Sequence, residues 1–233
     1  MLWSAPRSRS TAFFRMVTQR GDFTAVHEPF SYLAEFGQLD IGGTRVTSVP
    51  GLLDALRLLA GHGPVFAKET TGRRYPGVLA DRQFLASDCQ HTFLIRHPRE
   101  TIASYHGLSP GAPLHKIGFE SQYEVFAAVA RATGRTPVVL DSADLVSRPA
   151  AAVAAYCERV GIGFRPEALA WPAVDRPEWA KSRGWHAEVA ASTGFSQARA
   201  EPGVDVTQHP VLRRYLGHHL PYYQKLYAHR LMV

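Results

Sequence analysis

Short apolar runs alternate with longer stretches of helical periodicity along most of this chain, and this alternation constrains the fold more than any other feature. Such an order is typical of a mostly parallel sheet that is covered by helices. We therefore predict an α/β fold with a central, mostly parallel sheet flanked by helices. The expected strands are residues 1–5, 23–27, 64–68, 91–95 and 137–140. The expected helices are residues 10–19, 52–61, 99–105, 121–132 and 149–160.

The length and composition of the chain indicate one domain that folds throughout. A chain of 233 residues lies within the range of a single α/β domain, and 45% hydrophobic and 20% charged residues are ordinary globular proportions. We expect residues 1–233 to form one domain. Prolines, tryptophans and histidines become frequent after Phe164, so we expect residues 164–233 to form a lid region with a closing helix near 211–230, disturbed at Pro221.

The net charge of the chain is positive and comes mainly from arginine. A formal charge of +6 suggests an anionic partner, although an Ala- and Arg-rich genome explains the same excess. Cys89 and Cys157 lack the paired spacing of a zinc ribbon or a disulfide framework, which indicates a reducing compartment. No stretch approaches the roughly 20 apolar residues of a membrane span. We therefore predict a cytoplasmic protein without a membrane partner, and its oligomeric state stays open.

Two arginines and three hydroxyl residues follow the first predicted strand directly. This segment consists of Pro6, Arg7, Ser8, Arg9, Ser10 and Thr11. It lies between a strand and a helix, where unpaired backbone N–H groups and the helix dipole attract anions. It lacks the glycines and the final Gly-Lys-Ser/Thr of a Walker loop, which argues against ATP hydrolysis. The alternative interpretation is an exposed basic turn in which Ser10 or Thr11 caps the helix.

A second arginine-bearing segment follows the fourth predicted strand. Arg96 ends that strand, and a helix is expected to start near Pro98. Ser104 lies about two helical turns beyond Arg96, so a phosphate fits between the guanidinium and the hydroxyl. The alternative is a solvated arginine and a small core serine. Two strand ends of one sheet then deliver arginine to helix N-termini.

These segments resemble the nucleotide-dependent sulfotransferases, whose donor is 3'-phosphoadenosine 5'-phosphosulfate. Residues 6–11 are similar to the 5'-phosphosulfate loop of that family, and residues 96–104 are similar to its 3'-phosphate motif. Residues 138–149 resemble its strand, Asp-Leu turn and proline-started helix, and the three segments stand in the same order. The resemblance implies a three-layer, P-loop-like fold. It also implies transfer of the sulfuryl group to a hydroxyl or amine of a small molecule.

The sequence departs from the family pattern in three places. Arg9 stands where the loop usually has glycine, which places a long side chain where the backbone approaches the donor. Ala143 replaces the usual acidic residue before the Asp-Leu pair. The tail lacks the basic Lys-Gly loop of many members, and residues 181–186 and 191–195 stand in its place. We expect these two segments either to close over the adenosine or to be surface loops.

The resemblance implies that Arg7 neutralises the bridging oxygen and the departing 5'-phosphate, while Ser8, Ser10 and Thr11 bind the same phosphate. Because positioned cations can stabilise the developing charge, this chemistry needs no metal. Lys68 ends an apolar strand, so it can reach the sulfonate from the carboxyl edge of the sheet. An exposed lysine is the alternative interpretation of Lys68.

A base for the acceptor proton is expected after the second predicted strand. His27 and Glu28 stand there, and Glu28 with the following proline resembles the short Glu-Pro element of several sulfotransferase branches. We assign Glu28 as the base, with His27 as the alternative. A purely structural interpretation also stays open, in which Glu28 pairs with Arg7 or Arg9 to hold the loop.

The sequence mostly lacks the motifs that other functions on such a fold require. A small-molecule kinase or nucleotide hydrolase on the same fold needs magnesium ligands and a loop lysine. A nucleic-acid-binding module needs a basic stripe with interleaved aromatic residues, so we predict no nucleic-acid partner. No His-Glu-x-x-His or Cys-x-x-Cys motif is present, so we predict no metal site. A degenerate member that binds the donor without transfer stays open because of Arg9.

The acceptor site is expected in loops, whose composition does not name a substrate. The candidate loops are residues 30–50, 108–119 and 171–185. Their aromatic and apolar content favours a small hydrophobic alcohol, phenol or amine.

Overall fold

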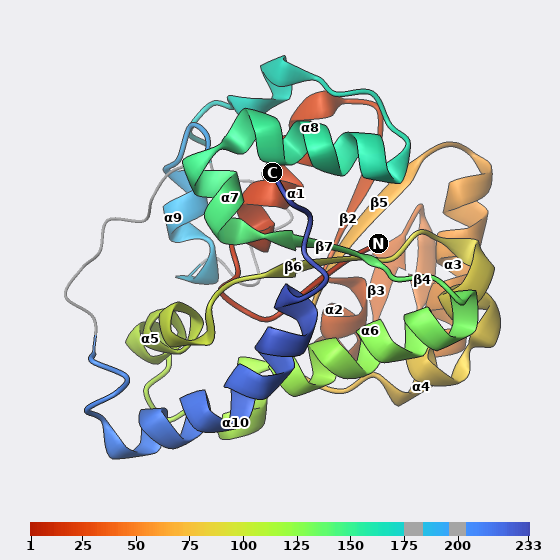
Figure 1. The fold of residues 1–233 in the computed structure, drawn as a ribbon. Coiled ribbons are helices and arrows are strands. Elements are labelled where there is room, and N and C mark those ends of the chain that lie inside the picture. The colour runs from red at the N-terminus through yellow and green to blue at the C-terminus, as the bar shows by residue number, and fades with distance from the viewer. Residues whose placement is uncertain (175–183, 196–203) are drawn as a thin grey trace.

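A five-stranded parallel sheet forms the centre of the computed structural model, which describes residues 1–174, 184–195 and 204–233 (Figure 1). The strand order is β2-β5-β1-β6-β7. The strands are β1 (Leu2–Ser4), β2 (Thr24–His27), β5 (Val65–Thr70), β6 (Thr92–Ile95) and β7 (Val138–Asp141). Each falls on one of the predicted apolar runs, so the predicted α/β fold class is confirmed.

Helices cover the sheet and fill most of the connections between its strands. They are α1 (Ser10–Arg20), α2 (Pro29–Phe36), α3 (Val49–Gly61), α4 (Pro76–Ala80), α5 (Pro98–Leu108), α6 (Phe119–Thr133), α7 (Ser142–Ser147), α8 (Pro149–Val160), α9 (Ala187–Ala190) and α10 (Pro210–Tyr227). A separate hairpin pairs β3 (Leu39–Ile41) with β4 (Thr44–Val46). The expectation of a loop over residues 30–50 is therefore wrong, because α2 and this hairpin occupy most of it.

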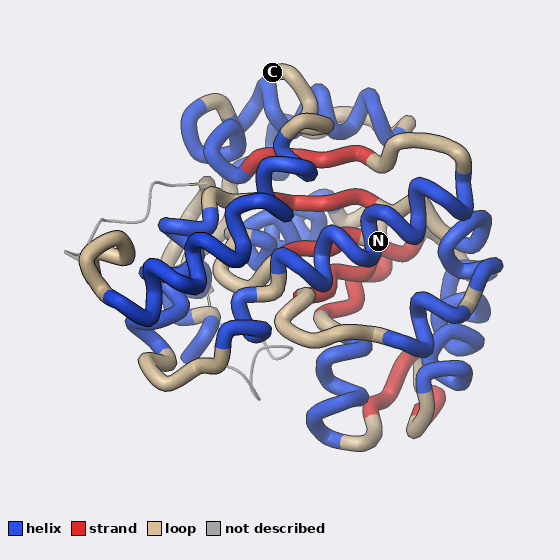
Figure 2. The backbone as a smooth tube through the Cα atoms, turned by 60° about the horizontal axis from the view of Figure 1, so that its bottom comes forward, coloured by secondary structure: helices blue, strands red, loops and turns tan. Residues whose placement is uncertain are grey.

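Alternate residues of each strand enter two hydrophobic layers, as the period of a strand requires. Leu2, Leu94 and Leu140 pack with side chains of α1 and α8. Trp3, Phe93 and neighbouring residues pack with side chains of α3, α6 and α10 on the opposite face. Figures 1 and 2 show these helices on the two sides of the sheet. Because both faces are covered, each strand contains a short apolar run, which is why the sequence revealed them, although β5 continues into the buried Lys68 and Glu69.

The loops after β1 and β6 lie where the strand order reverses, because the connections that leave these two neighbouring strands run to opposite sides of the sheet. After β1 the chain crosses to β2 on one side of the sheet, whereas β6 and β7 lie on the other side. Sheets of this type bind ligands at such a point, beyond the carboxyl ends of the strands. In the described part of the chain, no helix has the length and apolar character needed to cross a membrane.

Candidate functional site at the carboxyl edge of the sheet

The loop between β1 and α1 has a backbone conformation that side chains rarely adopt. Arg7 and Arg9 have φ angles of 63° and 64°, in the left-handed region. Arg9 therefore stands in a glycine-like conformation, at a cost of about 1–2 kcal/mol relative to ordinary backbone. Its carbonyl starts α1 by accepting hydrogen bonds from Ala12 and Phe13. The expectation that Ser10 or Thr11 caps the helix is wrong, because Arg9 holds the cap position without a side-chain hydrogen bond.

Arg7 and Arg96 connect the ends of β1 and β6. Arg96 Nη1 donates a hydrogen bond of 2.9 Å to the carbonyl of Arg7. Arg7 Nε donates one of 2.9 Å to the hydroxyl of Ser104 on α5. The hydroxyl of Ser104 thus faces Arg7, whereas spacing alone had suggested a phosphate between Ser104 and Arg96. The two predicted phosphate-binding segments therefore form one continuous surface.

Two exposed carboxylates pair with these largely buried arginines. Arg7 Nη2 lies 2.8 Å from Glu188, whose side chain is 73% exposed. Arg96 Nε lies 2.9 Å from Glu100, and Arg9 lies 3.8 Å from the same carboxylate. Burial lowers the pKa of Arg7 and Arg9, but guanidinium groups remain charged at neutral pH. Because exposed ion pairs contribute little, an anion of higher charge can displace both carboxylates.

The third segment of the sequence pattern completes this side of the site. Asp141 ends β7 and accepts a hydrogen bond from the backbone N–H of Ala143, which caps α7. Arg9 Nη1 donates to the hydroxyl of Ser142 at 3.3 Å. The cap uses only the backbone N–H of residue 143, so it forms with alanine at this position. Arg9 is turned toward the site rather than away from it, because its neighbours Ser142 and Glu100 lie on both sides of its guanidinium.

A buried ion pair lies beside the basic loop, between Lys68 in the second half of β5 and Glu28 after β2. Lys68 Nζ donates to Glu28 Oε1, and the Lys68 side chain is only 1% exposed. The interpretation of Lys68 as an exposed lysine is therefore wrong. Within the described residues Glu28 pairs with Lys68, and not with Arg7 or Arg9 as the structural interpretation supposed. Glu28 has a φ of 45°, so strain again accompanies a charged residue at a strand end.

Glu69 fixes the position of Glu28 and was not identified from the sequence. Its buried carboxylate accepts hydrogen bonds from the backbone N–H groups of Phe30 and Ser31 at 2.7 and 3.1 Å, and from the hydroxyl of Tyr75. Burial, followed by the charge of Glu28, raises the pKa of Glu69 to about 7. Glu69 thus anchors the first turn of α2, at whose N-cap Glu28 stands. The only sequence clue is a charged pair, Lys68 and Glu69, that ends an apolar run.

Two imidazoles complete the site, and one of them comes from the C-terminal region. His27 Nδ1 lies 3.2 Å from the hydroxyl of Tyr32, and its Nε2 lies 3.9 Å from Glu28 Oε1. His186 Nδ1 lies 3.3 Å from the hydroxyl of Thr11, and the two imidazole rings are 5.1 Å apart. Burial and then the charge of Lys68 lower the pKa of both, that of His186 to about 3, so both are neutral at neutral pH. His186 lies in the segment that was expected to cover the adenosine or to form a surface loop, but its place beside His27 and Glu28 was not predicted.

These residues surround an open cleft of about 1800 Å³. Ten of the eleven predicted site residues line it: Pro6, Arg7, Ser8, Arg9, Ser10, Thr11, Glu28, Lys68, Arg96 and Ser104. The eleventh, His27, is buried and does not line the cleft. Gly184, Trp185 and His186 line it as well, and the carbonyl of Trp185 accepts a hydrogen bond from Arg7. Residues 181–183 of the expected adenosine cover lie outside the described residues. The part from 184 to 195 covers the basic loop.

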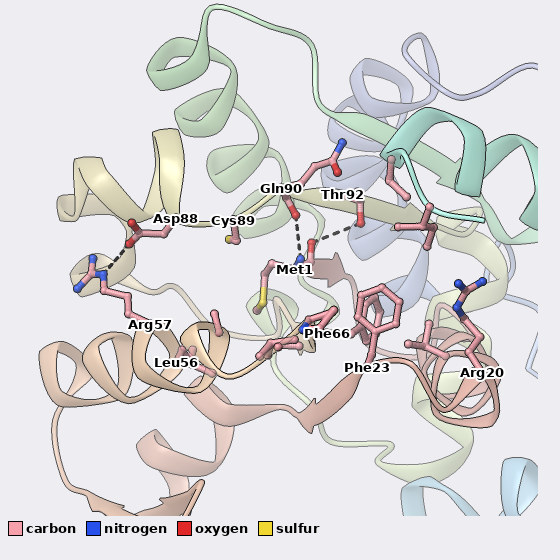
Figure 3. A pocket seen from close by; sticks show the side chains of 18 of the residues that line it. Met1, Arg20, Phe23, Leu56, Arg57, Phe66, Asp88, Cys89, Gln90 and Thr92 are labelled. Atoms are coloured by element: carbon pink, nitrogen blue, oxygen red, sulfur yellow. Dashed lines mark hydrogen bonds and ion pairs between the residues drawn. The ribbon is translucent and has the colours of Figure 1, made fainter. Parts of the chain in front are cut away.

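A second cavity of about 360 Å³ lies at the opposite, amino edge of the sheet (Figure 3). Phe23, Leu56 and Phe66 give it a mainly apolar lining. Its charged groups are already paired, since Arg57 contacts Asp88 at 2.6 Å together with two other aspartates. Burial raises the pKa of Cys89 and of Cys157, which keeps both thiols protonated. The cavity is therefore lined mainly by apolar side chains, by paired arginines and by protonated thiols.

Fold and cleft together define a class: an α/β domain with an arginine-rich loop at the carboxyl edge of a parallel sheet. Over residues 1–230 the chain matches the family described as "Sulfotransferase domain". The chain belongs to this sulfotransferase family.

Similar proteins extend the comparison. Two Arabidopsis thaliana proteins, branched-chain-amino-acid aminotransferase-like protein 2 and protein 1, are 26% and 27% identical to the chain over 97% of its length. The chain covers 41% of each of them, so it spans less than half the length of these relatives. Among solved structures, the sulfotransferase domain of the curacin biosynthetic pathway has 12% identity and a TM-score of 0.48, covering 93% of this chain and 95% of that one. The sulfotransferase domain of the Synechococcus PCC 7002 olefin synthase has 15% identity and a TM-score of 0.49, covering 99% and 94%.

Proposed function

We propose that this protein transfers the sulfuryl group of 3'-phosphoadenosine 5'-phosphosulfate to a hydroxyl or amine of a small molecule. One observation carries the proposal: Arg7, Arg9 and Arg96 converge at the ends of two neighbouring strands, beside the buried pair of Lys68 and Glu28. Cations placed where a phosphate must leave, next to a carboxylate that can take a proton, are what sulfuryl transfer requires. Membership of the sulfotransferase family supports the same reaction type.

The basic loop would hold the 5'-phosphosulfate. Pro6 shapes the turn, Arg7 supplies charge, and Ser8, Ser10 and Thr11 supply hydroxyls and N–H groups. Ser8 Oγ supports this assignment, because it is fully buried and has no hydrogen-bond partner within the described residues. A buried hydroxyl without a partner costs about 1–3 kcal/mol, which a phosphate oxygen would recover.

Arg96 and Ser104 would hold the 3'-phosphate, with Arg9 as a further cation. In the structure, Glu100 forms an ion pair with Arg96, and Glu188 forms one with Arg7. Both carboxylates are exposed enough to turn into solvent, so donor binding would exchange two weak ion pairs for charged contacts to phosphate.

Glu28 would act as the base. The acceptor oxygen or nitrogen attacks sulfur, the bond from sulfur to the bridging oxygen breaks, and the acceptor proton passes to Glu28. Lys68 would leave Glu28 and contact a sulfonate oxygen, while Arg7 stabilises the charge on the departing phosphate. His27 is the alternative base, since its Nε2 lies 3.9 Å from the Glu28 carboxylate. In this scheme Arg7 and Lys68 supply the stabilising charge, and no metal takes part.

The acceptor would bind against apolar and aromatic side chains of the cleft. Its lining includes Tyr32, Phe36, Tyr105, Leu108 and Phe195. Side chains of this kind fit a small hydrophobic alcohol, phenol or amine. The free thiols of the chain fit a reducing compartment such as the cytoplasm.

A degenerate member that binds the donor without transferring sulfuryl is the second candidate. Its specific support is the left-handed conformation of Arg9, which carries a side chain where glycine is usual. Donor binding without turnover would mark it, whereas dependence of turnover on magnesium would mark a kinase or nucleotide hydrolase.

Calorimetric titration with 3'-phosphoadenosine 5'-phosphate, the product of the donor, tests the nucleotide site. We expect micromolar binding by the wild type and a loss of about 1.5–3 kcal/mol in Arg7→Ala and in Arg96→Ala, which is about 10- to 100-fold in affinity. Arg135→Ala is the matched control, because Arg135 is exposed and precedes β7 at the other edge of the sheet. Absence of binding by the wild type, with or without magnesium, would refute the proposal.

A further inference from the structure

His27, Glu28 and His186 form a cluster that the sulfuryl-transfer scheme does not fully use. One ligand atom from each lies within 4.8 Å of the other two. Within the described ranges, they are the one such group of three metal-ligating side chains. The sequence could not reveal it, because His186 comes from the opposite end of the chain to the adjacent pair.

His27 contributes a buried ring nitrogen without a hydrogen-bond partner in the described residues to this cluster. The imidazole is 2% exposed, and its Nδ1 is engaged with the hydroxyl of Tyr32 at 3.2 Å. Its Nε2 is buried and has no hydrogen-bond partner in the described part of the molecule. Leaving such an atom unpaired costs about 1–3 kcal/mol, so the site gains free energy when Nε2 acquires a partner.

We propose that His27, Glu28 and His186 bind a divalent transition metal ion, best represented by Zn²⁺, and that the bound ion inhibits the protein by occupying Glu28. Two imidazoles and one carboxylate form a common ligand set of zinc sites with an open coordination position. Here the open position faces the cleft, because Glu28 and His186 line it. Metal binding does not depend on the proposed reaction; only the inhibition rests on it.

The geometry needs a small contraction. In tetrahedral zinc sites the ligand atoms are about 3.4 Å apart, given bonds of about 2.0–2.2 Å. The ligand atoms must therefore approach one another by at most about 1.4 Å from the 4.8 Å that bounds their present separations. Supporting contacts orient both rings, since Tyr32 lies at Nδ1 of His27 and Thr11 lies at Nδ1 of His186. Such second contacts are typical of histidines that bind metals.

Lys68 should weaken metal binding at this cluster, so substitution of Lys68 tests the proposed site. Its ammonium group pairs with Glu28 Oε1 and would repel a cation at close range. Lys68→Met should therefore tighten metal binding, whereas metal held by unrelated surface histidines would not respond to this substitution.

The experiment is a titration of the tag-free protein with Co²⁺, followed by its visible absorption, with Zn²⁺ as the competitor. We expect His186→Ala to weaken binding by at least about tenfold, the scale on which loss of even a supporting group weakens metal affinity. His218→Ala is the matched control, because His218 also lies beside a carboxylate, at 3.1 Å from Glu120. Equal affinity of wild type and His186→Ala, equal losses in His186→Ala and His218→Ala, or no gain in Lys68→Met would overturn the proposal.

Binding of 3'-phosphoadenosine 5'-phosphate, measured on the same preparations, separates this inference from the proposed function. If the wild type does not bind the nucleotide but gives a Co²⁺ spectrum that His186→Ala does not give, the metal site is supported and the proposed reaction is refuted. If nucleotide binds and no Co²⁺ spectrum forms, the metal proposal alone is refuted. Far-ultraviolet circular dichroism of each variant checks that it is folded.

Discussion

The two edges of the central sheet differ in character although the same five strands build both. At the carboxyl edge, an open cleft holds buried cations, and all three non-glycine residues with positive φ in the described chain, Arg7, Arg9 and Glu28, stand there. At the amino edge, the cavity of Figure 3 is apolar, and Arg20 and Arg57 beside it are paired with aspartates. The carboxyl edge combines strained backbone with buried cations whose partners include the exposed carboxylates of Glu100 and Glu188, whereas the amino edge has neither feature in the described chain.

This difference shows why apolar space alone does not locate a reactive site. An apolar pocket with a few convergent polar groups is a common ligand site, but at the amino edge the charged groups already satisfy one another. Strained backbone and buried atoms without partners persist only where the surrounding structure holds them in place. Ser8 Oγ and His27 Nε2, both at the carboxyl edge, are atoms of this kind. A ligand bound at this edge would give both atoms a hydrogen-bond partner and recover part of that free energy.

Removal of the proposed base should have the largest effect. Glu28→Gln keeps the size of the side chain but cannot accept the acceptor proton, so we expect the transfer rate to fall by about 10²- to 10⁴-fold. Affinity for 3'-phosphoadenosine 5'-phosphate should stay near that of wild type, because Arg7 and Arg96 carry that contact. A sulfuryl-transfer assay and calorimetry measure the two quantities. A variant with the wild-type rate and affinity would return the base assignment to His27.

A substitution at the amino edge should change stability and leave the nucleotide site intact. Leu56 lines the apolar cavity of Figure 3, and Leu56→Ala removes buried methyl groups. We expect the free energy of unfolding to fall by about 2 kcal/mol, the low end for such changes, because Leu56 already borders a cavity. Urea denaturation measures the loss. If Leu56→Ala also weakened nucleotide binding as strongly as Arg7→Ala, the two edges would be coupled and the contrast between them would fail.

The strain at Arg9 can be measured by comparing two variants. Arg9→Ala and Arg9→Gly both remove the charge near Glu100, but only glycine adopts the left-handed conformation without cost. We expect Arg9→Gly to be more stable than Arg9→Ala by about 1 kcal/mol in urea denaturation. Both variants should bind the nucleotide with equal affinity. Equal stability would mean that the loop relaxes, and that this part of the carboxyl edge stores no strain.

The sequence predicted the fold well because the sheet is covered on both faces. Buried strands are continuous apolar runs, and each of the five stood out for that reason. The elements that were missed are short: β3 and β4 have three residues each, and α2 begins at a proline and has eight. Elements of this length carry too few residues to show a period.

The site was predictable only where residues follow a strand directly. Arg7, Lys68 and Arg96 could be placed at one edge because the carboxyl ends of parallel strands meet there. Side-chain partners could not be predicted, as the contact between Arg7 and Ser104 shows. The segment of His186 was expected as a possible cover of the nucleotide, but the contacts of its imidazole with Thr11 and His27 depend on the folding of the C-terminal region. The sequence therefore indicated which edge of the sheet carries the site, and only the structure showed which side chains contact one another there.

The pairing of Arg7 with Glu188 gives the smallest predicted effect and the finest test of the contrast. At the amino edge, Asp81 and Asp88 pair with Arg57 through side chains that are only 25% and 13% exposed, whereas the Glu188 side chain is 73% exposed and contacts Arg7 from the surface. Glu188→Gln removes a competitor of the incoming phosphate. Since an exposed ion pair is worth about 0–1 kcal/mol, we expect nucleotide affinity to rise by about two- to fivefold. Calorimetry at low salt measures the gain, and Glu158→Gln on α8 is the control. Weaker binding by Glu188→Gln would show that Glu188 positions Arg7 instead of competing for it, and the ion pairs at the two edges would then serve the same structural purpose.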